Sequence, residues 1–117
     1  MTQIIGHFIN GRLVPDTARS QAVYNPSTGQ VSKQVALAGK ATVEEAIAAA
    51  QAAFVDWRNT PVLKRVRIMF EFKALLEANR DQICALIGAE HGKIVHDAAG
   101  ELQRGIENVE YACAAPE

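Results

Sequence analysis

The chain has 117 residues, an ordinary length for one domain with a modest hydrophobic core. Lysine and arginine total 12 against 13 for aspartate and glutamate, so the net charge is −1. This balance gives no reason to expect a nucleic acid or an acidic membrane surface as a partner. The sequence shows no secretory signal and no run near the ~20 apolar residues of a membrane span. We therefore expect a cytoplasmic protein.

Two turn signals divide the first part of the chain. Asn10-Gly11 lies between apolar residues, which is the strongest short signal for a β-hairpin with a type I′ turn. Asn25-Pro-Ser-Thr-Gly29 predicts a second turn, and it leads into an expected strand over residues 31–37. These signals together predict short antiparallel strands.

From Thr42 onward the pattern predicts helices. Thr42-Val-Glu-Glu45 has the form of a capping box, in which Thr42 and Glu45 bond each other's free backbone N–H groups. An alanine-rich run of high helix propensity continues to Trp57. Thr60 is then expected as the N-cap of the next helix, with Pro61 at its first position.

The second expected helix carries an apolar stripe and is followed by a break. The stripe consists of Val62, Val66, Met69, Phe70 and Leu76. Asn79 and Asp81 predict the break, and Gly92 predicts the end of the third helix. Because the helices follow one another without an intervening strand, their apolar faces need another layer to cover them. We therefore expect a fragment that packs on something absent from this chain.

The last expected helix has two distinct faces. Its apolar stripe consists of Ala98, Leu102, Ile106, Val109 and Cys113. The far side carries Asp97, Glu101, Arg104, Asn108 and Tyr111. Arg104 is within reach of Glu101 and Asn108, which predicts a weak ion pair on a solvated surface. Gly105 costs a helix interior ~1 kcal/mol relative to alanine, so a close neighbour or a nearby ligand site would explain it.

The sequence supplies few groups for catalysis. Cys84 and Cys113 are separated by 28 residues, which suits neither a zinc site nor a disulfide framework, and we expect both to be buried. His7, His91 and His96 have no metal-ligand spacing. There is no G-x-G-x-x-G and no P-loop. We therefore predict no catalytic, cofactor-binding or metal-binding residue in this chain.

Four segments resemble, in order, the beginning of the aldehyde dehydrogenases. Phe8-Ile-Asn-Gly11 is similar to the family's "I-N-G" turn, and Asn25-Pro-Ser-Thr-Gly29 is similar to its "N-P-x-T-G" turn. The helix ending at Trp57 and Glu90-His-Gly-Lys93, similar to "E-x-G-K", come next. The resemblance implies an α/β fold, with residues 1–117 as an incomplete N-terminal segment of the NAD-binding domain. In that segment short strands precede three to four consecutive helices, and the catalytic and oligomerisation parts are absent.

The segment Gly100-Glu-Leu-Gln-Arg-Gly-Ile-Glu-Asn-Val-Glu-Tyr111, followed by Ala112-Cys-Ala-Ala-Pro116, narrows the resemblance. It is similar to the G-E-x-x-R-G-I-E-N-V-E-[FY]-A pattern of the methylmalonate-semialdehyde dehydrogenases. These are the CoA-acylating branch of the superfamily, known from valine and inositol catabolism. The resemblance implies an NAD-dependent homo-oligomer, a dimer or tetramer. It converts a small semialdehyde and coenzyme A to propionyl-CoA or acetyl-CoA plus CO₂, with NAD bound outside this segment.

Arg104 is the one site residue that the resemblance implies. The matching arginine of that branch holds the carboxylate of the substrate, and a guanidinium suits this because it binds a carboxylate through two parallel hydrogen bonds. Two alternatives stay open. One is another aldehyde dehydrogenase that hydrolyses its thioester, and the other is a stand-alone helical interaction module without catalysis.

Overall fold

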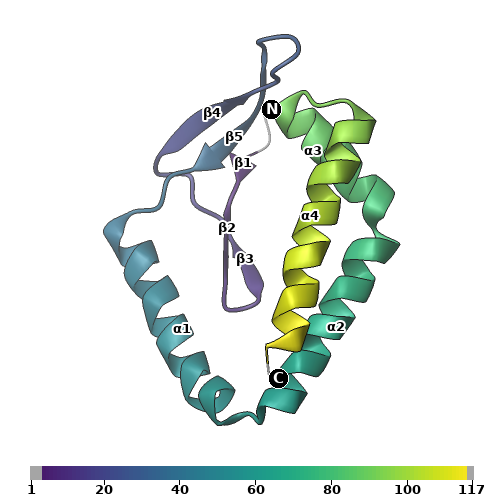
Figure 1. Cartoon of the computed structure of the whole chain (residues 1–117). Coiled ribbons are helices and arrows are strands. Elements are labelled where there is room, and N and C mark those ends of the chain that lie inside the picture. The colour runs from purple at the N-terminus through teal and green to yellow at the C-terminus, as the bar shows by residue number, and fades with distance from the viewer. Residues whose placement is uncertain (1–3, 116–117) are drawn as a thin grey trace. The chain divides into compact units, whose positions relative to one another are not determined.

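The computed structural model describes residues 4–115, which divide between Asn59 and Thr60 into two compact units. Within these residues, five short strands precede four consecutive helices, as the sequence predicts (Figure 1). Pro116, the last residue of the segment that narrows the resemblance, lies outside the described residues.

The first unit contains the predicted hairpin. Strands β2 (His7–Ile9) and β3 (Arg12–Val14) pair antiparallel, with Phe8 opposite Leu13. Asn10 and Gly11 connect them with φ angles of 51° and 76°. Two consecutive left-handed residues define the type I′ turn, whose twist matches that of the flanking strands. The Asn10-Gly11 prediction is therefore confirmed.

The other sheet has the order β1-β5-β4 and is mixed. Strands β4 (Ser20–Tyr24) and β5 (Val31–Ala36) pair antiparallel, and the turn between them closes with the Gly29 N–H donating to the Asn25 carbonyl at 2.8 Å. Strand β1 (Ile4–Ile5) pairs with β5 in parallel, so the prediction of antiparallel strands alone was wrong. The reason is the long connection between β1 and β5, since a parallel pair requires such a crossover.

Helix α1 (Lys40–Asn59) begins two residues before Thr42, so the predicted capping box was wrong. The Val43 N–H donates to the Gly39 carbonyl at 3.2 Å, which places Thr42 inside the first turn. A glycine is an acceptable residue before a helix, and here the start at Lys40 overrides the Thr-x-x-Glu signal. Although α1 carries several large apolar residues, none of its residues is buried by the described chain.

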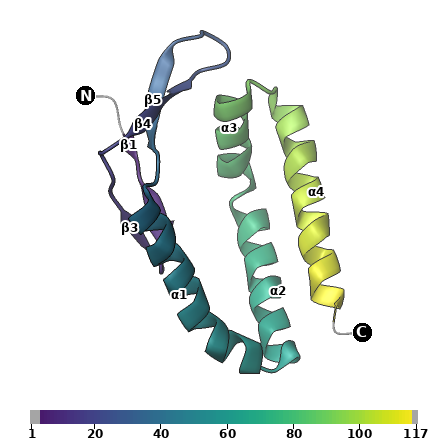
Figure 2. The ribbon, with the colours of Figure 1, turned by 90° about the vertical axis from the view of Figure 1, so that its left-hand side faces the viewer.

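Helix α2 (Val62–Ala78) begins one residue later than predicted. Pro61 is its N-cap, because a ψ of 138° is extended and not helical, and the Pro61 carbonyl accepts from the Lys64 N–H at 2.9 Å. The predicted break is present. Both the backbone N–H and the side-chain Nδ2 of Asn79 donate to the Leu75 carbonyl, and α3 (Arg80–His91) follows directly (Figure 2).

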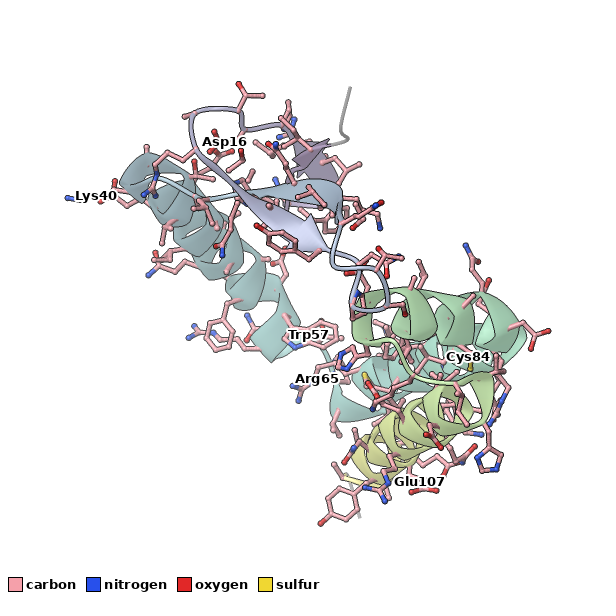
Figure 3. The ribbon with its side chains drawn as sticks, turned by 90° about the horizontal axis from the view of Figure 1, so that it is seen from above. Asp16, Lys40, Trp57, Arg65, Cys84 and Glu107 are labelled. Carbon is pink, nitrogen blue, oxygen red and sulfur yellow. The ribbon has the colours of Figure 1, made fainter. Side chains whose placement is uncertain are left out.

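The core of the second unit lies where α4 (Val95–Ala114) runs beside α2 and α3 (Figures 1 and 2). All five residues of the predicted apolar stripe of α4 are buried, which confirms that prediction. Ile106 is 2% exposed and packs in a cluster with Ala98, Leu102 and Cys84 of α3. Figure 3 shows Cys84 within the helical unit and Glu107 on the outer side of α4.

The stripe predicted for α2 is only partly covered by the described residues. Val66, Met69 and Leu76 are half-buried, whereas Val62 and Phe70 remain exposed. This agrees with the expectation that the helices need a further layer. None of the helices within residues 4–115 combines the length and the apolar character required to cross a lipid bilayer.

Candidate functional site

An open pocket of about 310 Å³ lies on the exposed face of α4, at its N-terminal half. Most of its lining residues are charged, both charge signs are present, and the residue singled out in the sequence, Arg104, is among them. The lining residues are Lys93, His96, Asp97, Gly100, Glu101 and Arg104. The helical part of this set recurs at steps of three and four, so one face of α4 presents it.

Lys93 reaches the pocket from the connector between α3 and α4. Gly92 ends α3 with a φ of 73°, a left-handed conformation that favours glycine, and its N–H donates to the Gly88 carbonyl at 2.8 Å. A Cβ on Gly88 would lie 3.2 Å from the Lys93 carbonyl, so the absence of a side chain there lets the connector pass close to α3. Two glycines thus direct Lys93 toward the start of α4.

The Lys93 ammonium donates a hydrogen bond to the Glu101 carboxylate, and the two groups form an ion pair. This hydrogen bond lowers the pKa of the Glu101 carboxyl below its ordinary value, against partial desolvation and with some help from the charge of His91. Helical spacing allowed an ion pair between Glu101 and Arg104, but Glu101 pairs with Lys93 instead. Lys93 belongs to the connector between α3 and α4, and helical periodicity says nothing about residues outside a helix.

Arg104 itself is exposed on this face. The side-chain amide of Asn108 donates to the Arg104 backbone carbonyl at 2.9 Å and does not touch the guanidinium. Within residues 4–115, the guanidinium takes part in no hydrogen bond or ion pair. A planar cation with five donors therefore faces an open pocket, an arrangement suited to binding a carboxylate.

The remaining lining residues were not singled out as site residues in the sequence. His96 is almost fully exposed, and its Nδ1 lies 3.6 Å from the Asp97 carboxylate. Gly100 has open space where a Cβ would be, and so does Gly105 on the other side of Arg104. Within the described residues, therefore, no close neighbour explains the glycine at position 105. The only available signal for Gly100 was its place four residues before Arg104 on the same face.

The cysteines and the histidine of the first unit lie outside the pocket on α4. Cys84 and Cys113 are free and buried, as predicted, and neither lines the pocket on α4. No group of three or more histidine, cysteine, aspartate or glutamate side chains in residues 4–115 could hold a metal ion. In the first unit, His7 Nε2 lies 3.6 Å from the Asp16 carboxylate, an isolated pair.

The chain matches the aldehyde dehydrogenase family over residues 13–117, and it belongs to that family. The malonate-semialdehyde dehydrogenase of Pseudomonas aeruginosa is 59% identical over 111 residues, covering 95% of this chain and 22% of that protein. The match confirms the family suggested by the four turn and helix segments.

Solved structures give the same result. The methylmalonate-semialdehyde dehydrogenase of Oceanimonas doudoroffii is 67% identical, with a TM-score of 0.94 over 99% of this chain and 24% of that one. A structure from Sinorhizobium meliloti, assigned to the same enzyme class and complexed with NAD, is 37% identical, with a TM-score of 0.94 and the same coverages. The chain thus spans about a quarter of the length of these relatives.

Proposed function

We propose that residues 1–117 are the N-terminal segment of the NAD-binding domain of a CoA-acylating, NAD-dependent (methyl)malonate-semialdehyde dehydrogenase. The names of the relatives support the substrate, and the neighbour complexed with NAD supports the cofactor. The whole enzyme would convert methylmalonate semialdehyde to propionyl-CoA, and malonate semialdehyde to acetyl-CoA, each with loss of CO₂. It would act in the cytoplasm as a homo-oligomer, a dimer or a tetramer.

The contribution of this segment is to hold the substrate's carboxylate on Arg104. The observation that carries this proposal is the guanidinium that faces the α4 pocket without a partner among the described residues. Both semialdehydes carry a carboxylate beside the reacting aldehyde. A fixed cation that binds this carboxylate orients the aldehyde toward a nucleophile elsewhere in the enzyme. Because Arg104 projects from the middle of a helix with a buried face, its backbone position is well defined.

The chemical steps belong to other parts of the enzyme in this proposal. NAD would accept the hydride there, and a reactive cysteine thiolate would form the thioester that passes to coenzyme A. Neither buried cysteine of this chain suits that role, and the sequence has no glycine-rich phosphate loop. We predict that the purified segment has no dehydrogenase activity and no measurable affinity for NAD⁺. Calorimetric titration tests this, and micromolar binding would contradict it.

Replacing Arg104 with leucine in the full-length enzyme tests the proposed role. We expect kcat/KM for methylmalonate semialdehyde to fall by an amount equivalent to about 2–5 kcal/mol where the whole enzyme excludes water from the site, and by much less where the site is wet, because the carboxylate loses its cation. Propanal has no carboxylate, so its kcat/KM should change little. Arg104→Lys should retain part of the activity, because it keeps the charge but loses the two-pronged geometry.

Arg67→Leu is a matched control, because Arg67 is also an exposed helical arginine but lies on α2, away from the pocket. It should leave the ratio of the two kcat/KM values unchanged. Equal losses for both substrates in Arg104→Leu would show a structural role, and no loss would show an ordinary surface residue.

Product analysis separates the proposed reaction from the thioester-hydrolysing alternative. With coenzyme A present, the proposed enzyme forms an acyl-CoA, and without it turnover stops after the thioester accumulates. Steady formation of a free acid in the absence of coenzyme A would disprove CoA acylation. That result would not decide the role of Arg104, which the kinetics of Arg104→Leu with the two substrates test separately.

A further inference from the structure

The Arg104 guanidinium has no partner among the described residues, although a carboxylate that could pair with it lies nearby. Glu101 is three residues earlier on the same face of α4, about 4.5 Å along the helix axis. Glutamate and arginine at this spacing are ordinarily neighbours that can form an ion pair. Such a pair would occupy the guanidinium with the same chemical group that the substrate presents.

Lys93 occupies this competitor. Its ammonium comes from the connector before α4 and donates to the Glu101 carboxylate, while Arg104 keeps its donors free within the described residues. We propose that Lys93 is a positioning residue: by holding the Glu101 carboxylate, it leaves the Arg104 guanidinium open to the substrate's carboxylate. This inference rests on the proposed function of Arg104.

The other charged groups near the pocket do not replace Lys93 in this role. His96 lies beside Asp97, 3.6 Å away, and is almost fully exposed to solvent. His91 lowers the pKa of Glu101 only through its charge, and its effect is the smallest of those on that carboxyl. Asp97 is seven residues before Arg104, about 10 Å along the helix axis, so it cannot reach the guanidinium as Glu101 can.

Lys93→Met in the full-length enzyme tests the inference. Freed from Lys93, Glu101 should turn to Arg104 and compete with the substrate. We expect KM for methylmalonate semialdehyde to rise about five-fold, the upper range for an exposed ion pair, with kcat nearly unchanged. The kcat/KM for propanal should stay the same, since that substrate does not use Arg104. A melting temperature close to that of the unmodified enzyme confirms that the fold is intact.

Two double variants separate the competition from a simple change of charge. Lys93→Met with Glu101→Gln removes the competitor, so KM should return to near its original value. Lys93→Met with Asp97→Asn restores the same net charge but leaves Glu101 ionised, so KM should stay high. Recovery in both double variants would show that only the net charge of the pocket matters, and it would overturn the inference. Recovery in neither would mean that Lys93 binds the substrate itself, which would also overturn it.

Failure of this inference and failure of the proposed function give different results. If Arg104→Leu lowers activity selectively but Lys93→Met does not raise KM, only the inference about Lys93 is wrong. If Arg104→Leu has no selective effect, the role of Arg104 is wrong, and the inference falls with it.

Discussion

The two faces of α4 differ in how much of their surroundings the chain itself provides. The apolar face, from Ala98 to Cys113, is buried against α2 and α3, and every residue of its predicted stripe has neighbours. The opposite face carries Arg104 without a partner among the described residues, and Gly100 with open space where a Cβ would be. The first face is explained by folding. The second fits the binding role that we propose for Arg104.

This contrast shows which residues of a helix to test for stability and which to test for binding. Burial against neighbouring helices gives a residue a stabilising role that any substitution reveals. A charged side chain without a partner, or a glycine with open space beside it in a helix, either lowers the stability of the fold or leaves it unchanged. Such features therefore point to a role outside folding.

The largest expected effect is on the buried face. Ile106→Ala removes a side chain that is 2% exposed, and it should lower the free energy of unfolding by about 2–5 kcal/mol through lost burial and the cavity left behind. The neighbouring exposed Glu107→Ala should change it by less than about 0.5 kcal/mol. Urea unfolding of both variants measures the difference. Similar values for the two would show that the α4 core is poorly packed.

Gly100 and Gly105 are both exposed glycines of α4, and they give a matched pair of test positions. Each has room for a Cβ in the described chain, so replacement by alanine should stabilise α4 by up to about 1 kcal/mol in either case. Gly100 lines the pocket with Arg104, whereas Gly105 does not. Gly100→Ala should therefore also raise KM for methylmalonate semialdehyde. Thermal unfolding and kinetics on both variants test this, and equal kinetic effects would remove Gly100 from the site.

The smallest expected effect concerns Lys73 of α2. Its ammonium lies 3.0 Å from Glu77 and 3.2 Å from Glu110 of α4, and the hydrogen bonds to these two carboxylates raise the pKa of Lys73 above 10.5. A raised pKa in the folded state means stabilisation that is complete below pH 10.5 and is lost as the pH rises through the folded-state pKa. Lys73→Met should flatten this alkaline loss.

Thermal unfolding of Lys73→Met at increasing pH measures that effect. The control is Lys64→Met, which removes an exposed lysine from the same helix. A Lys64→Met curve that flattens equally would assign the alkaline loss to the overall charge of the protein. Persistence of the full loss in Lys73→Met would assign it to another group.

The sequence alone predicted the regular parts of this molecule well. The stripe from Ala98 to Cys113 was correct because one periodicity governs one long helix. The Asn10-Gly11 hairpin was correct because the left-handed turn requires those residue types. The Thr42 capping box failed because the helix begins at Lys40, a choice that the local signal did not contain.

The candidate site was only half predictable for a related reason. Arg104 is marked by its place on the polar face and by the resemblance to a family motif. Lys93 lies eight residues before Glu101, outside the helix, where helical periodicity gives no information. The pair between Lys93 and Glu101 depends on Gly88, which lets the connector pass close to α3, and on Gly92, whose left-handed conformation turns the chain toward α4. Local sequence patterns do not predict such tertiary contacts.

Two lysines from outside α4 pair with carboxylates on it. Lys93 holds Glu101 on one side of Arg104, and Lys73 holds Glu110 on the other. Sliding α4 by one turn, about 5.4 Å, would separate both pairs at once. Grafting residues 100–111 onto another helical scaffold would therefore transfer Arg104 without the two lysines that pair with Glu101 and Glu110. A transplanted site needs the lysines of the neighbouring segments as much as it needs the motif.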